Sequence, residues 1–406
     1  MTVGEPVRLL HKGEATRRAS FLELFFDLVF VFSLNRVVAR AVEDLTTDRG
    51  HNHLPTVLAG GGKTALLLLI LWSVWQQNAW TTSRYDPYHP IIQLSVLIAL
   101  VSSMVIGVGI PRAFGINGGA LVVAGYLIAQ LSRPALLAVA LRGTPRQRLK
   151  IRTLIVYSCT GIIWILGFLL VKSWPRLYVW GAALAIEYLA NRTGWPVPGL
   201  GRSAPAKWDI AGAHLAERYQ QFFLVALGEA ILVDGLSYAR SGFGALETAA
   251  FAIALGITIL IWRIYFYRAG EIFAEAVGRA RRPARIGRSA ADSHLLMVAG
   301  VVATAIGYDL AIEHPMGHTP PAWIAVIAGG PALYMIGRSR FEREVFDRVS
   351  PSRLVAIGVL ALVFPALFWA PTVAVLFAVG LVLFGVALAD ARRAWGKPPE
   401  PPAPPL

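Results

Sequence analysis

The sequence has little of what stabilises most soluble or secreted domains. It contains a single cysteine, Cys159, so no disulfide can form within the chain. Asp, Glu, Lys and Arg together make up 15% of the residues, whereas soluble proteins carry roughly 25%. These shortages exclude a disulfide framework and argue against a soluble globular domain.

Signatures of several enzyme classes are also missing. The chain has no GxSxG, no HExxH and no protein-kinase signature. The run from Gly60 to Thr64 looks like a phosphate-binding loop, but the first glycine of that motif would fall at Val57 and no strand precedes it. These motifs therefore indicate no known enzyme class, no cofactor and no metal site.

Apolar length is what the sequence has in abundance. Hydrophobic residues make up 56% of the chain, and long apolar stretches recur from residue 21 to residue 391. The alternation of polar and apolar residues that a membrane barrel needs is absent. We predict an all-α polytopic membrane protein. About twelve transmembrane helices are expected, at 21–42, 64–83, 91–110, 119–141, 153–171, 175–191, 212–238, 244–267, 290–312, 322–337, 354–370 and 372–391.

The net charge of +14 is distributed unevenly between the two sides of these spans. Most of the 38 Lys and Arg residues fall in the two tails and in the even-numbered loops. Cytoplasmic loops of membrane proteins carry this excess of basic residues. The distribution predicts cytoplasmic N- and C-termini, and it explains the positive charge without a nucleic-acid partner.

The two halves of the chain resemble each other at an offset near 200 residues. Arg133-Pro134-Ala135-Leu136 in the fourth span corresponds to Gly330-Pro331-Ala332-Leu333 in the tenth. Because each half has six spans, both insert in the same orientation, which predicts two parallel six-helix repeats. The expected parts are an N-terminal tail (1–20), a first repeat (21–192), a linker (193–211), a second repeat (212–393) and a Pro-rich tail (394–406).

Three carboxylates fall inside apolar segments. Glu23 and Asp27 are four residues apart, so they share one face of the first helix. Glu229 lies near the middle of the seventh. An ionisable group in a membrane is costly and marks a functional site by default. These acids are candidates to bind a cation or relay a proton, while Arg133 and Arg36 could instead hold them in structural ion pairs.

Arg133 in the fourth span, and Glu217 and Arg218 at the start of the seventh, are further candidate ion-coupling residues. His214 and Glu217 have a spacing that can chelate metal in helical bundles, but a lone pair does not define a metal site.

A second group of charges lies in one loop and has two interpretations. The five arginines Arg279, Arg281, Arg282, Arg285 and Arg288 could simply fix the topology, or they could bind anionic lipid headgroups.

Several of these segments resemble the bacterial low temperature requirement A (LtrA) family. The stretch 23–32, Glu-Leu-Phe-Phe-Asp-Leu-Val-Phe-Val-Phe, is similar to its N-terminal signature, and 214–229 is similar to its second signature. The family usually has Glu-Arg-Phe-Gly where this chain has Glu217-Arg218-Tyr219-Gln220. The stretches 262–266 and 294–315 also fit. The resemblance implies a multi-pass protein of the bacterial plasma membrane, and it implies no particular molecular activity.

Three classes of function are compatible with the sequence. The leading hypothesis is a transporter or channel that uses the intramembrane carboxylates for cation or proton coupling. The alternatives are a lipid-modifying enzyme, with the same acids as acid and base, and a structural or sensory membrane protein. Direct carboxylate–guanidinium pairs in a dry core would favour the structural role for the residues involved.

Overall fold

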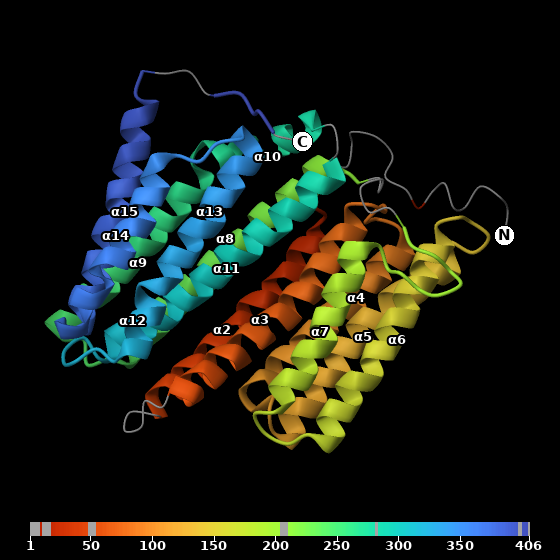
Figure 1. The fold of residues 1–406 in the computed structure, drawn as a ribbon, viewed down its shortest axis with the longest axis horizontal. Coiled ribbons are helices and arrows are strands. Elements are labelled where there is room, and N and C mark those ends of the chain that lie inside the picture. The colour runs from red at the N-terminus through yellow and green to blue at the C-terminus, as the bar shows by residue number, and fades with distance from the viewer. Residues whose placement is uncertain are drawn as a thin grey trace. The chain divides into compact units, whose positions relative to one another are not determined.

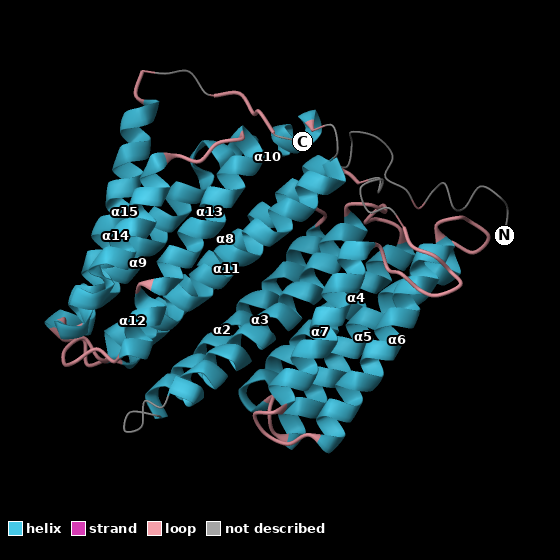
Figure 2. Ribbon diagram, in the orientation of Figure 1, coloured by secondary structure: helices cyan, strands magenta, loops and turns pink. Residues whose placement is uncertain are grey.

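A computed structural model describes residue 9 and residues 18–47, 54–203, 210–280, 283–396 and 400–404. Within these residues the regular secondary structure is helical and contains no strand (Figure 2), apart from an isolated bridge between Val197 and Gly201. The predicted all-α class is therefore confirmed. Most of the predicted N-terminal tail, and residues 204–209 of the predicted linker, lie outside the described residues.

Nine helices in the described ranges are long and apolar enough to cross a membrane. They are α3 (Leu54–Thr82), α4 (Pro90–Gly109), α5 (Ile116–Ala140), α6 (Gln147–Leu170), α8 (Gly212–Arg240), α9 (Ala245–Tyr265) continued by α10 (Glu271–Arg279), α11 (Pro283–Glu313), α14 (Pro351–Val363) continued by the 3-10 helix η5 (Phe364–Trp369), and α15 (Thr372–Ala394). The remaining α-helices are α2 (Phe21–Thr47), α7 (Arg176–Thr193), α12 (Pro321–Ile327) and α13 (Gly329–Phe346).

The twelve predicted segments each coincide with helical structure, but the number of spans stays a prediction. The segments at 21–42, 175–191 and 322–337 fall on α2, α7 and the α12–α13 pair, which are not among the nine. Charged residues lower the hydropathy of α2, α7 and α13, and α12 has only 7 residues. The two parallel repeats likewise stay a prediction.

Local sequence signals explain where several helices begin and end. Pro90 and Pro351 stand in the first turns of α4 and α14, where the missing N–H costs no hydrogen bond. Gly194 ends α7 with a left-handed conformation, φ 86°, which glycine adopts without steric cost.

The chain divides into two compact units, and each is described by itself. Unit 1 comprises residues 1–37 and 61–218, and unit 2 comprises residues 38–60 and 219–406. In unit 1, α4 packs against α5, α5 against α6 and α6 against α7, so that these helices lie side by side (Figure 1). In unit 2, α11 packs along α13, and α9 packs against α15.

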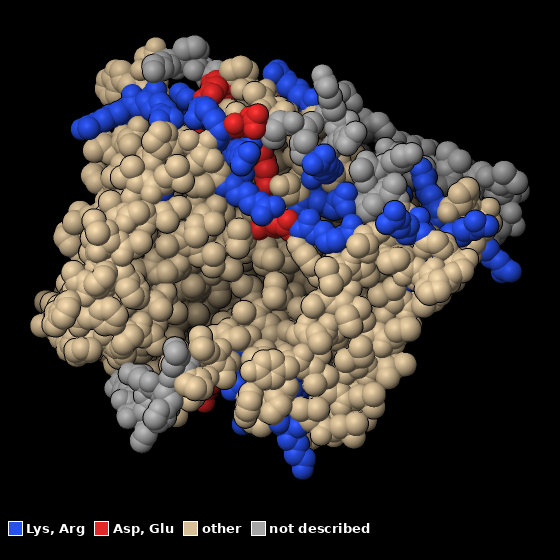
Figure 3. Space-filling view, viewed as in Figure 1, with Lys and Arg blue, Asp and Glu red and all other residues tan. Residues whose placement is uncertain are grey.

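Charged side chains avoid the flanks of the helices. On the face drawn in Figure 3, Lys, Arg, Asp and Glu gather near helix ends, and the flanks are covered by uncharged residues. Large apolar side chains of the helices are also exposed, among them Leu170, Leu362 and Phe377. This pattern is the one that a lipid environment requires, because hydrocarbon cannot solvate charge.

The packing of α11 on α13 depends on glycine. A Cβ atom at Gly300 would lie 2.5 Å from the backbone nitrogen of Tyr334, and one at Gly330 would lie 2.7 Å from the backbone nitrogen of Thr304. Neither backbone atom can move without shifting its helix. The two helices therefore touch backbone to backbone, as small residues permit in membrane helices.

We expect Gly300→Ala to destabilise the protein by about 1–3 kcal/mol, because the added methyl group forces the two helices apart. The matched control is Gly256→Ala in α9, where a Cβ would meet no atom within 4 Å. Thermal unfolding of the purified proteins in detergent, followed by tryptophan fluorescence, measures both. Equal melting temperatures for the two variants would contradict the proposed backbone contact.

Candidate functional site

Four ionisable side chains meet inside unit 1. Glu23 and Asp27 come from α2, and His214 and Arg218 come from the first turns of α8. Each pair is four residues apart, so each helix directs both of its side chains to one face. All four residues are at most 2% exposed. The structure therefore joins three of the sequence-predicted residues, Glu23, Asp27 and Arg218, in one buried cluster.

Arg218 binds Asp27 through two parallel hydrogen bonds. Its Nη1 donates to Asp27 Oδ2 at 2.8 Å, and its Nη2 donates to Asp27 Oδ1 at 2.7 Å. The indole Nε1 of Trp75, on α3, donates to the same Oδ1 at 2.9 Å. This two-pronged geometry is the strongest form of arginine–carboxylate pairing.

Glu23 contacts three other members of this region, Ser20, His214 and Arg218. Its Oε2 accepts hydrogen bonds from the backbone nitrogen and the hydroxyl of Ser20, both at 2.9 Å, and lies 3.3 Å from His214 Nε2. Its Oε1 lies 3.4 Å from Arg218 Nε. His214 Nδ1 is 2.9 Å from the hydroxyl of Ser83. The imidazole thus connects Glu23 to the segment that follows α3.

This arrangement bears on the role of the first-helix acids. The structural alternative named Arg133 and Arg36 as guanidinium partners, but the partner of Asp27 is Arg218. Removing one member of such a pair leaves an uncompensated buried charge. Direct pairing favours a structural role for Glu23 and Asp27, since Asp27 accepts three hydrogen bonds and Glu23 Oε2 accepts two from Ser20.

Two further carboxylates are buried in unit 2 and have a different environment. Glu229 and Asp234, both on α8, are 0% and 1% exposed. Both oxygens of each carboxylate lack a hydrogen-bond partner within the part of the chain that the structure describes. Glu229 was predicted from the sequence and Asp234 was not, although Asp234 also lies in an apolar stretch.

Polar groups continue along α8 toward its C-terminal end. Ser237 donates to Asp309 Oδ1, on α11, at 2.7 Å. Arg240 donates to the same oxygen at 2.9 Å and lies 2.9 Å from Glu313. The side chain of Arg240 is 56% exposed, so this network reaches the surface of unit 2.

The remaining predicted site residues lie elsewhere. Arg133, on α5, lines a cavity in unit 1 and donates to Gln130 Oε1 at 3.1 Å. Glu217 is half-buried on α8. Among the described residues, no group of three or more His, Cys, Asp and Glu is arranged to hold a metal ion.

The arginine-rich loop is described only in part. Arg279 pairs with Glu275 at 2.5 Å, and the Nε of Arg288 donates to the Ala284 carbonyl at 3.4 Å. Arg281 and Arg282 lie outside the described residues. Binding of anionic lipid headgroups at this loop stays a prediction.

Two further buried networks contain acids that were not predicted from the sequence. In unit 1, Glu187 accepts hydrogen bonds from the hydroxyls of Tyr126 and Thr160 and from Trp164 Nε1. In unit 2, Arg353 binds both oxygens of Asp390 and lies 3.1 Å from Glu342. The Glu187 network holds its acid with neutral donors, which hydropathy does not reveal.

The long apolar helices, their uncharged flanks and the buried ionic pairs define a multi-pass helical membrane protein. The family model of the bacterial low temperature requirement A protein (LtrA) matches residues 18–388, nearly the whole chain, so the protein belongs to this family. The chain is 29% identical, over 381 residues, to an uncharacterised protein of Rhizobium meliloti (strain 1021). This match covers 91% of the chain and 88% of that relative. No solved structure matches the chain.

Loss of Arg218 is expected to cost about 3–5 kcal/mol of stability, because it leaves Asp27 charged and unpaired in an apolar interior. We expect Arg218→Met to lower the melting temperature strongly and Asp27→Asn/Arg218→Met to recover part of the loss. Thermal unfolding in detergent compares the variants with the wild type. The single variant Asp27→Asn is measured as well. If the loss of stability in the double variant equalled the sum of the losses in the two single variants, Asp27 and Arg218 would not be coupled.

Proposed function

We propose that this LtrA-family protein is a transporter or channel that moves protons or small cations, and that Glu229 and Asp234 are the groups that bind the moving ion. One observation carries the proposal: both carboxylates are buried in a helix suited to span the membrane, without a hydrogen-bond partner among the described residues. The family match supports the membrane setting and leaves the activity open.

The physical argument rests on the cost of a buried charge. An isolated ionised carboxylate in an apolar medium is unfavourable by several kcal/mol or more, so such a group takes up a proton or a cation. A carboxylate held by a guanidinium has no such need. Glu229 and Asp234 are therefore suited to exchange an ion, and Asp27 is suited to hold helices together.

The path along α8 supports the same proposal. The exposed Arg240 lies eleven positions after Glu229. At 1.5 Å per residue, this corresponds to about 16 Å along the helix. Asp234, Ser237 and Asp309 lie within that interval or border it. Polar side chains thus continue from the buried carboxylate to the end of the helix, as an ion leaving the membrane interior would require.

A structural or sensory role is the second candidate, and the Asp27–Arg218 pair favours it. In that case Glu229 and Asp234 would remain neutral and would exchange nothing. The lipid-modifying enzyme receives less support. The Ser83 hydroxyl, His214 and Glu23 do stand in the order of nucleophile, base and acid, but all three residues are at most 1% exposed, so a substrate has no access to them.

Electrical recordings test the proposal. The full-length protein is reconstituted into liposomes on a solid-supported membrane, and proton, potassium and sodium gradients are applied in turn. We expect a current for the wild type that falls about tenfold or more in Glu229→Gln and Asp234→Asn, since each variant removes the ionisable oxygen.

The matched control is Glu43→Gln, which removes an exposed acid from α2 and should leave the current unchanged. Melting temperatures close to that of the wild type verify that the variants are folded. Absence of current under every gradient, in folded protein, would sink the proposal and leave the structural role.

We also propose that both termini face the cytoplasm of the bacterial plasma membrane, since the basic loops support that orientation. Cys159 is the single cysteine, so Cys159→Ser provides a background without cysteine. Arg146→Cys and Lys172→Cys then place one thiol at each end of α6. In intact spheroplasts we expect a membrane-impermeant maleimide to label the Lys172→Cys variant, and the Arg146→Cys variant only after permeabilisation. Labelling with the opposite pattern would invert the proposed orientation.

A further inference from the structure

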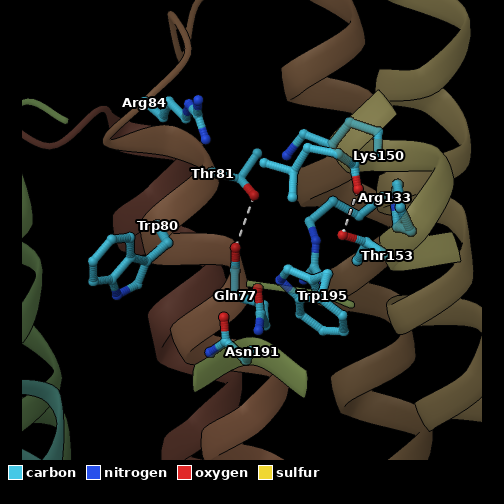
Figure 4. Close-up of a pocket in the computed structure, with 11 residues that line it drawn as sticks. Gln77, Trp80, Thr81, Arg84, Arg133, Lys150, Thr153, Asn191 and Trp195 are labelled. Atoms are coloured by element: carbon cyan, nitrogen blue, oxygen red, sulfur yellow. Dashed lines mark hydrogen bonds between the residues drawn. The ribbon is translucent and has the colours of Figure 1, made fainter. Parts of the chain in front are cut away.

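A cavity in unit 1 is lined mainly by basic and neutral polar side chains. Arg133 comes from α5, Lys150 from α6 and Asn191 from α7, while Gln77 belongs to α3 and Arg84 follows it. In Figure 4 the charged ends of Arg84 and Lys150 lie on one side of the space, and Gln77 and Asn191 border its other side. The lining of this cavity contains no carboxylate.

Two of these cations have no counter-ion in the part of the chain that the structure describes. Arg133 is 7% exposed, and its hydrogen bond goes to the neutral amide of Gln130. Its guanidinium carbon lies 6.0 Å from the centre of the Tyr157 ring. The ammonium of Lys150 lies 5.1 Å from the centre of the Tyr85 ring. Neither cation forms an ion pair with a described carboxylate.

Cations that line one small cavity repel one another, and the repulsion grows as water is excluded. Other buried guanidinium groups in this protein have compensating acceptors. Carboxylates bind Arg218 and Arg353, and backbone carbonyls accept several hydrogen bonds from Arg176 and from Arg338. A mobile anion would provide the same compensation in the cavity. The uncompensated positive charge therefore favours an anion as the ligand of this cavity.

The donors in the cavity match an oxyanion. Arg133 offers a planar fork of N–H groups, Lys150 offers a point charge, and the amides of Gln77 and Asn191 offer neutral donors. The cavity has a volume of about 40 Å³, and one water needs roughly 10–15 Å³ of such space. A compact oxyanion suits this size, and a nucleotide base does not.

The position of the cavity at the ends of several helices favours a phosphate group among the possible oxyanions. Arg84 follows the end of α3, Lys150 is in the first turn of α6, and Asn191 is in the last turn of α7. The cavity thus lies at helix ends, the level at which a bilayer places its phosphate groups. Trp80 and Trp195 also line it, and tryptophan is enriched at that level.

We propose that unit 1 contains a binding site for a phosphate-type oxyanion, held by Arg133, Lys150 and Arg84 with Gln77 and Asn191 as neutral donors. The oxyanion is either the headgroup of an anionic phospholipid or a soluble phosphate. This site is separate from Glu229 and Asp234 and does not depend on ion movement by those residues.

Thermal unfolding of the full-length protein in a neutral detergent tests for the site. Inorganic phosphate is titrated against chloride at equal ionic strength, and dioleoyl phosphatidylglycerol is compared with dioleoyl phosphatidylcholine by native mass spectrometry. We expect phosphate or phosphatidylglycerol to stabilise and bind the wild type. Lys150→Gln and Arg133→Gln should weaken binding about tenfold, because a hydrogen bond to a charged group contributes that order.

The matched control is Arg148→Gln, which removes an exposed charge from the same turn of α6 but does not line the cavity. A second readout separates binding from a structural role. Without ligand, Lys150→Gln should unfold at the same or a higher temperature than the wild type, because it relieves repulsion between cations. This variant decides the matter even if Arg133→Gln fails to fold.

The outcomes distinguish the two sources of the oxyanion. Stabilisation by inorganic phosphate supports a soluble ligand, and retention of phosphatidylglycerol alone supports a lipid headgroup. The proposal is overturned if neither binds, or if Arg148→Gln weakens binding as much as Lys150→Gln does.

Discussion

The cost of placing a charge in apolar surroundings governs the polar chemistry of this protein. The chain meets that cost in different ways within the described residues. Asp27 is compensated by Arg218, and Glu187 is surrounded by neutral hydrogen-bond donors. Glu229 has neither kind of partner. Under the proposed function, the environment of each acid, more than its position along a helix, distinguishes acids that hold helices together from acids that exchange an ion.

Much of the fold could be predicted from the sequence, because hydrocarbon leaves the backbone no alternative to helices here. The first and last residues of the helices were harder to predict. The span expected at 153–171 begins at Gln147, and the one expected at 290–312 begins at Pro283. In both cases the added turns carry basic residues. Hydropathy marks the part of a helix that lies in the bilayer, whereas the hydrogen-bonded helix continues into the aqueous boundary.

The sequence predicted some residues of the candidate site but not how they pair. The four-residue spacing correctly placed Glu23 and Asp27 on one face, but 191 residues separate Asp27 from Arg218, and no local rule joins them. Arg133 was expected to neutralise an acid and instead lines a cavity without carboxylates. Asp234 could have been found by its apolar neighbours alone. Pairing is a property of tertiary structure, and a single sequence records only which residues need a partner.

The glycine contacts between α11 and α13 have a mechanical consequence. Side chains at an ordinary helix interface can change rotamer and let the helices slide, but two backbones in direct contact have nothing to rearrange. The contacts at Gly300 and Gly330 therefore hold α11 and α13 together as one rigid pair within unit 2. Any motion inside that unit must therefore bend or shift its other helices relative to α11 and α13.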